Sequence, residues 1–142
     1  MILADTGFWL ALAGPADMHH ARALQAARDL AEEDFVCTWP VITETVYLIG
    51  KRLGIEARLR FMAELTAGVC TIQALPDTAL RRMELLMRRY RNLPMDLADA
   101  SLVVLAEELG EGRILSTDTR DFGAYRWKNT KPFTNLLLPE PT

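Results

Sequence analysis

The chain has 142 residues, of which 50% are hydrophobic and 25% charged, and its formal net charge at pH 7 is -3. This length is typical of one domain with its own core, and the composition excludes intrinsic disorder. The longest apolar runs, 8–13 and 102–106, are far shorter than the roughly 20 residues of a membrane span, so no membrane protein is expected. The acidic balance argues against a wholly basic nucleic-acid-binding surface but not against a local one.

Short apolar runs alternate along the chain with longer stretches of helical periodicity. Pro40 stands near the first turn of one predicted helix, and three glycines follow predicted helix ends. In chain order, the predicted elements are strand 2–4, helix 19–33, strand 35–38, helix 40–53, helix 55–67, strand 69–72, a helix capped at 76–77 that runs to 90, helix 96–109, strand 113–116 and, as a fifth strand, 133–137. In the helix that ends at 90, the residues expected to face the core are Leu80, Met83, Met87 and Tyr90.

Strands separated by helices predict parallel pairing through right-handed crossovers. The fold class is therefore α/β, a single domain with a central, mostly parallel sheet of four or five strands flanked by helices. The domain is expected to span 1–138, followed by a loose tail at 139–142.

Two features bear on the compartment of the protein. Residues 7–14 resemble the apolar part of a signal peptide, but a positively charged leader is missing and Asp5 stands just before them, so a cytoplasmic protein is expected. The two cysteines, Cys37 and Cys70, lie in β-like runs, which favours buried thiols in a reducing compartment, with a disulfide or ligand pair as the alternative.

Acidic residues stand at or near the ends of the predicted strands. Asp5 follows the first strand, and Asp118 follows the fourth. Asp96 and Asp99 lie in the first turn of the helix before the fourth strand, and Glu44 lies about one turn into the helix after the second. Because the carboxyl ends of parallel strands meet at one edge of the sheet, we expect these acids to lie close together.

Carboxylates at close range raise one another's pKa and destabilise the fold unless a cation lies between them. Oxygen ligands without histidine or cysteine favour Mg²⁺ or Mn²⁺ over zinc. Such ions activate water and stabilise the leaving oxygen of a phosphodiester, and this chemistry needs no nucleophilic side chain. The pattern therefore predicts metal-dependent hydrolysis of phosphodiester bonds.

Each acid also has a purely structural interpretation. Asp96 and Asp99 have the spacing of a capping box, and the remaining acids could be turn, cap or solvated helix residues. Asp121 is expected to cap a short turn at 122–125.

Four segments in order resemble the motifs of the PIN domain, namely 2–6, 40–44, 96–100 and 115–118. With its length and the Asp121-Phe122 that follows, the chain is similar from residue 2 to about 137 to the VapC-type toxins of bacterial toxin–antitoxin pairs. The resemblance implies a Mg²⁺- or Mn²⁺-dependent endoribonuclease with a central parallel sheet. It implies an acidic site made of Asp5, Glu44, Asp99 and Asp118.

In the same resemblance, Asp5 and Asp99 are the principal metal ligands, and Asp96 is an extra acid beside the family's pattern position. Thr6 and Thr117 would donate hydrogen bonds to the substrate or to a water on the metal, or serve only as caps. The family also implies an RNA substrate, a cognate antitoxin and a homodimer as partners.

RNA binding requires cations near the metal site. The segment 120–131 adjoins Asp118, and its weak candidates for RNA contact are Arg120, Arg126 and Lys128. Trp127 could stack on a base or pack against the fold. The arginines of 81–89 form rows on one helix face, which is more typical of a solvated face. Trp9 and Trp39 are expected in the core or an interface.

Three other functions compete with the toxin. A PIN-type RNA-processing nuclease would lack an antitoxin, and a non-catalytic acidic module would bind a basic partner without cleavage. Phosphotransfer through an aspartyl intermediate usually needs a second acid two residues after the first, where this chain has Gly7. A P-loop NTPase is excluded because the phosphate-binding motif is missing.

Overall fold

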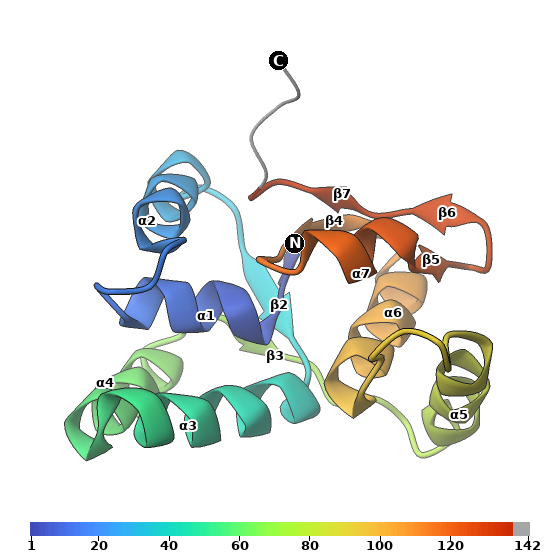
Figure 1. Cartoon of the computed structure of the whole chain (residues 1–142), viewed down its shortest axis with the longest axis horizontal. Helices are drawn as coiled ribbons and strands as arrows, with labels where there is room; N and C mark the ends of the chain where they lie inside the picture. Colours follow the sequence, from blue (N-terminus) through green and yellow to red (C-terminus); the bar gives the residue numbers. More distant parts are fainter. Residues whose placement is uncertain (138–142) are drawn as a thin grey trace.

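The computed structural model describes residues 1–137, and a parallel sheet runs through its centre (Figure 1). The strands are ordered β3-β2-β1-β4-β7. Their bounds are Ile2–Ala4 for β1, Phe35–Cys37 for β2, Thr71–Ile72 for β3, Arg113–Leu115 for β4 and Thr134–Asn135 for β7. Leu3 of β1 pairs with Val36 of β2 and with Ile114 of β4, so β1 is the central strand. The predicted α/β class is confirmed, with five strands; the predicted tail at 139–142 lies outside the described residues.

Seven helices cover the sheet within this part of the chain. They are α1 Thr6–Ala13, α2 His20–Asp29, α3 Trp39–Leu53, α4 Ile55–Thr66, α5 Ala79–Arg89, α6 Leu97–Leu109 and α7 Thr119–Ala124. In Figure 1, α1, α2 and α4 lie to the left of β1 and β2 and α5 and α6 to the right, and α7 overlaps β4 in this view. Helix α3 packs against both α1 and α6. Pro40 lies in the first turn of α3, and Gly110 ends α6 in the left-handed conformation, with a φ of 64°.

Helix α1 was not among the predicted elements. Its residues are apolar on almost every side, so the sequence carries no amphipathic period there. Phe8 and Trp9 are buried and pack in a T-shaped arrangement, with their ring centroids 5.1 Å apart. The apolar stretch that resembles part of a signal peptide is therefore a core helix. Within residues 1–137, no helix combines the length and the apolarity required to cross a membrane.

One local prediction was wrong, and one hairpin was not predicted. Leu80 was expected to face the core, but it is 65% exposed, and α5 instead buries Ala79, Met83 and Leu86. The segment after α7 was not expected to contain strands, yet Arg126–Trp127 (β5) and Lys131–Pro132 (β6) form an antiparallel hairpin. Two-residue strands are too short to show a period in the sequence.

Candidate active site

Asp5 is the residue at which β1 ends and α1 begins. Its backbone N–H donates to the carbonyl of Leu115 at 3.1 Å, which holds it beside the end of β4. One carboxylate oxygen accepts from the Phe8 N–H at 3.0 Å and so caps α1. The side chain is only 7% exposed, and this burial raises its pKa to about 6, with the charges of Asp118 and Glu44 adding to the effect.

Ser116 links Asp5 to Asp118, and the sequence analysis did not identify it. Its hydroxyl donates to the second carboxylate oxygen of Asp5 and accepts from the Asp118 N–H at 2.9 Å. Ser116 is fully buried directly after β4. A polar residue directly after a buried strand was the one signal that could have indicated it.

Asp118 caps α7 by accepting from the Asp121 N–H at 3.1 Å. The prediction that Asp121 caps a turn at 122–125 was therefore wrong, because Asp121 lies inside the first turn of the helix. Asp121 is 6% exposed and lines the same pocket as Asp5. Burial raises its pKa, and the hydrogen bond and charge of Asp118 add to this.

Asp96 and Asp99 form the capping box of α6 that their spacing allows. The Asp99 N–H donates to Asp96 at 2.9 Å, and the Asp96 N–H donates to Asp99 at 3.4 Å. Burial and the neighbouring charge of Asp96 raise the pKa of Asp99 to about 8. The Tyr125 hydroxyl, which the sequence did not indicate, donates to Asp99 at 3.4 Å. Asp99 therefore has both roles: it belongs to the capping box of α6, and its side chain also lines the acidic pocket.

Glu44 enters the site from α3. It is half-buried, and burial raises its pKa, helped by the charge of Asp96 and opposed by a hydrogen bond from Thr6. Thr117 also lines the site, and its side chain lies against Gly7 at the start of α1. A Cβ on Gly7 would stand 2.0 Å from the Thr117 hydroxyl, so only glycine permits this approach.

One pocket of about 260 Å³ collects all of these acids. Its carboxylates are Asp5, Glu44, Asp96, Asp99, Asp118 and Asp121, and Thr6 and Thr117 also line it. Among the lining residues of the described chain there is no lysine, arginine or histidine. Residues far apart in the sequence thus meet at the carboxyl edge of the sheet, as the predicted topology requires.

The donor set of this pocket fits a hard divalent cation. Every polar side chain that lines it offers oxygen. Burial raises the pKa of Asp5 and of Asp99, and the charges of the neighbouring acids raise both further. Within residues 1–137, no group of three carboxylate, imidazole or thiol side chains is arranged to coordinate one metal ion. Ion binding would therefore require side-chain rotation within the pocket.

The basic side chains predicted for RNA contact differ in whether they are free to bind RNA. Arg120 and Lys128 are exposed, whereas the guanidinium of Arg126 donates to the carbonyls of Gly123 and Tyr125 at 2.9 Å. Trp127 is 8% exposed and packs against the fold, so its ring face is not open for stacking.

The arginine rows of α5 are partly structural. Arg82 binds Glu107 through two hydrogen bonds, and both Arg82 and Arg89 bind the side chain of Asn129. These contacts tie α5 to α6 and to the β5–β6 hairpin.

Known proteins resemble this chain in sequence and in fold. No family model matches it. It is 29% identical over 125 residues to Ribonuclease VapC26 of Mycobacterium tuberculosis (strain ATCC 25618 / H37Rv), covering 88% of this chain and 92% of that protein. Its fold matches the crystal structure of M. tuberculosis VapC20, a sarcin–ricin loop cleaving toxin, with a TM-score of 0.75 and 20% identity over 84% of this chain and 92% of that one. The chain is therefore similar in sequence to a VapC ribonuclease and similar in fold to a VapC toxin.

Proposed function

We propose that this chain is a Mg²⁺- or Mn²⁺-dependent endoribonuclease and the toxin of a toxin–antitoxin pair. The observation that carries the proposal is the convergence of six carboxylates in one pocket whose described lining contains no basic side chain. The similarity to VapC26, a ribonuclease, and to VapC20, a toxin that cleaves the sarcin–ricin loop, supports RNA as the substrate. Two buried, unlinked cysteines agree with action in the cytoplasm.

In this proposal Asp5 and Asp99 are the principal ligands of the metal, with Glu44 and Asp118 completing the set. A divalent ion bound here would lower the pKa of a water and stabilise the charge that develops on the leaving oxygen. Ser116 acts as a positioning residue, because its hydroxyl holds the carboxylate of Asp5 in place.

The remaining residues of the pocket orient the substrate. Thr6 and Thr117 offer hydroxyl donors at its wall. A phosphate group is repelled by six carboxylates, so the backbone of RNA needs a cation to approach them. Arg120 is exposed two residues after Asp118 and is suited to contact a neighbouring phosphate. Asp96, at the exposed rim, is an auxiliary acid.

Metal removal tests the proposed activity. We expect the purified chain to cleave RNA in Mg²⁺ or Mn²⁺, to lose cleavage in EDTA and to regain it when either ion is added in excess. The measurement is gel analysis of a structured RNA, followed by sequencing of the new 5′ ends. Cleavage that is undiminished in EDTA would contradict the metal site. No cleavage of any RNA class with either ion would favour a non-catalytic acidic module.

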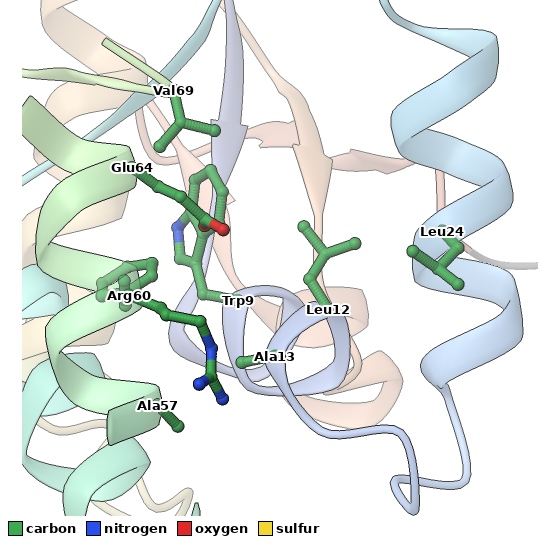
Figure 2. A pocket seen from close by; sticks show the side chains of 9 residues that line it. Trp9, Leu12, Ala13, Leu24, Ala57, Arg60, Glu64 and Val69 are labelled. Atoms are coloured by element: carbon green, nitrogen blue, oxygen red, sulfur yellow. The ribbon is translucent and has the colours of Figure 1, made fainter. Parts of the chain in front are cut away.

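We propose two protein partners, a cognate antitoxin and a second copy of the chain. A pocket of about 280 Å³, lined by apolar side chains together with Arg60 and Glu64, lies between α1, α2 and α4 (Figure 2). It is separate from the acidic pocket, and this supports an additional protein contact there. Elsewhere, large apolar side chains are exposed on a continuous surface around α3, α5 and α6. They are Trp39, Tyr47, Leu80 and Leu97, with exposed fractions of 56%, 58%, 65% and 46%. This second surface supports self-association.

Two measurements test these partners: the mass in solution tests the homodimer, and co-expression tests the antitoxin. Light scattering is expected to give twice the chain mass of 16.0 kDa, and Leu80→Glu is expected to shift the protein toward the monomer. Leu59→Glu, at a residue of α4 that is 55% exposed outside this surface, is the matched control. If a small reading frame lies directly upstream of the gene, co-expression with its product is expected to give a stable complex without RNA cleavage. A monomer that forms no such complex would favour an RNA-processing nuclease.

A further inference from the structure

Two thiols at neighbouring strands lie in direct contact. Cys37, the last residue of β2, is fully buried, and Cys70, directly before β3, is 7% exposed. Their Sγ atoms are 3.1 Å apart although the residues are 33 positions apart in sequence. β2 and β3 run side by side in Figure 1, with Cys37 paired to Ile72. The parallel pairing of the two strands therefore brings the thiols together.

The surroundings hold the Cys37 sulfur in this position. The indole N–H of Trp9 donates to it at 3.3 Å, and the Cys37 carbonyl accepts from the Gln73 N–H at 2.8 Å. A shared metal ion does not suit this spacing, because two thiolates bound tetrahedrally at about 2.3 Å from zinc stand about 3.8 Å apart. A disulfide, with sulfurs about 2.05 Å apart, requires them to approach by about 1 Å.

We propose that Cys37 and Cys70 are a redox-active pair that forms a reversible disulfide when a hydroperoxide oxidises the protein. The proposal does not depend on the ribonuclease function. In the first step the Cys70 sulfur attacks the near oxygen of hydrogen peroxide, the O–O bond breaks, the far oxygen leaves as water with the thiol proton, and a sulfenic acid forms at Cys70. In the second step the Cys37 sulfur attacks the Cys70 sulfur, the S–O bond breaks and water leaves. Overall, two thiols lose two electrons and two protons, and hydrogen peroxide is reduced to two waters.

Cys70 is the attacking thiol because it is the more accessible of the two. The hydrogen bond from the Cys37 thiol lowers the pKa of Cys70, whereas the contact with Cys70 and burial raise the pKa of Cys37. The two sulfurs do not line the pocket of Figure 2, but residues next to them do, so a small oxidant is expected to approach from that side. Val69, the neighbour of Cys70, and Trp9, which bonds Cys37, both line that pocket.

The disulfide would close a loop that contains the whole of α3 and α4. A cross-link over such a loop removes conformational entropy from the unfolded chain, so the oxidised protein is expected to melt about 5–15 °C higher than the reduced one. It would also join the two-residue edge strand β3 to β2.

Oxidation of the purified full chain tests the pair. After removal of dithiothreitol and treatment with hydrogen peroxide, we expect both thiols to disappear in a thiol titration, the intact mass to fall by two hydrogen atoms, and dithiothreitol to reverse both changes. The matched variants Cys37→Ser and Cys70→Ser are expected to show no such loss of mass.

Three outcomes would overturn the proposal. They are retention of both thiols, a gain of oxygen without loss of the two hydrogens, and a disulfide only between two chains. If a serine variant does not fold, peptide mapping of the oxidised wild-type chain decides, because the proposal requires a linked peptide that contains Cys37 and Cys70. RNA cleavage takes no part in these readouts, so failure here and failure of the proposed nuclease are distinct.

Discussion

Asp5→Asn is expected to reduce RNA cleavage by about 1,000-fold and at the same time to stabilise the metal-free protein at pH 8. The loss of activity follows from removal of one charged ligand, since metal-ion stabilisation of a transition state is worth several kcal/mol, and about 4 kcal/mol corresponds to that factor. The fold is expected to survive because asparagine can keep the cap on Phe8 and pair with the Ser116 hydroxyl.

The stability change follows from the pKa of Asp5, which burial raises to about 6 in the folded protein from an ordinary value of 3.8. The folded state therefore holds this proton more tightly than the unfolded state does. Stability from this group is fully present below pH 4 and is lost as the pH rises from about 4 to 6. Above pH 6 the loss is roughly 2–3 kcal/mol, which asparagine avoids. In a domain of this size, this corresponds to a melting temperature roughly 5–10 °C higher at pH 8.

Thermal unfolding in EDTA at pH 4 and pH 8 measures this difference, and RNA cleavage in Mg²⁺ measures the activity. The advantage of Asp5→Asn is expected to be near zero at pH 4 and largest at pH 8. Glu32→Gln, at an exposed acid outside the pocket, is the control and is expected to change neither property. A variant that cleaves RNA at the wild-type rate would remove Asp5 from the proposed ligand set.

Asp99→Asn is expected to reduce cleavage by about 100- to 1,000-fold, whereas Asp96→Asn is expected to reduce it by less than about 10-fold. Asp99 is half-buried, and its pKa is raised to about 8 by burial and the nearby Asp96 charge, as expected of a group whose ionised form requires a cation. Asp96 is exposed and serves as the cap of α6, a role that asparagine performs equally well.

The two variants form a matched pair because they replace the two members of one capping box by the same residue. Their melting temperatures are expected to stay within a few degrees of each other at pH 5, which separates a catalytic effect from a folding effect. Rates of cleavage at saturating Mg²⁺, followed by a Mg²⁺ titration, distinguish the two positions. The reverse order of activity loss would assign the metal to Asp96.

Much of the architecture could be predicted because it depends on local patterns. The apolar β-rich run at β1, the amphipathic period of α3 with Pro40 in its first turn, and Gly110 after α6 each act through the conformational preference of a few neighbouring residues. Helix α1 and the β5–β6 hairpin could not be predicted in the same way. The first is apolar on almost every side, and the second has strands of only two residues.

The sequence by itself determined that Asp5 and Asp118 follow strands and that those strands run parallel, which is sufficient to bring these two acids to one edge. Glu44 and Asp99 lie on α3 and α6, and the packing of these helices brings them to the same pocket. Only the tertiary structure decided which groups hold and surround them. Ser116 and Tyr125 bond to the acids across 111 and 26 positions of the chain. The thiol contact of Cys37 spans 33 positions. Such contacts depend on sheet register and helix packing, which bring distant residues together at distances that no local periodicity encodes.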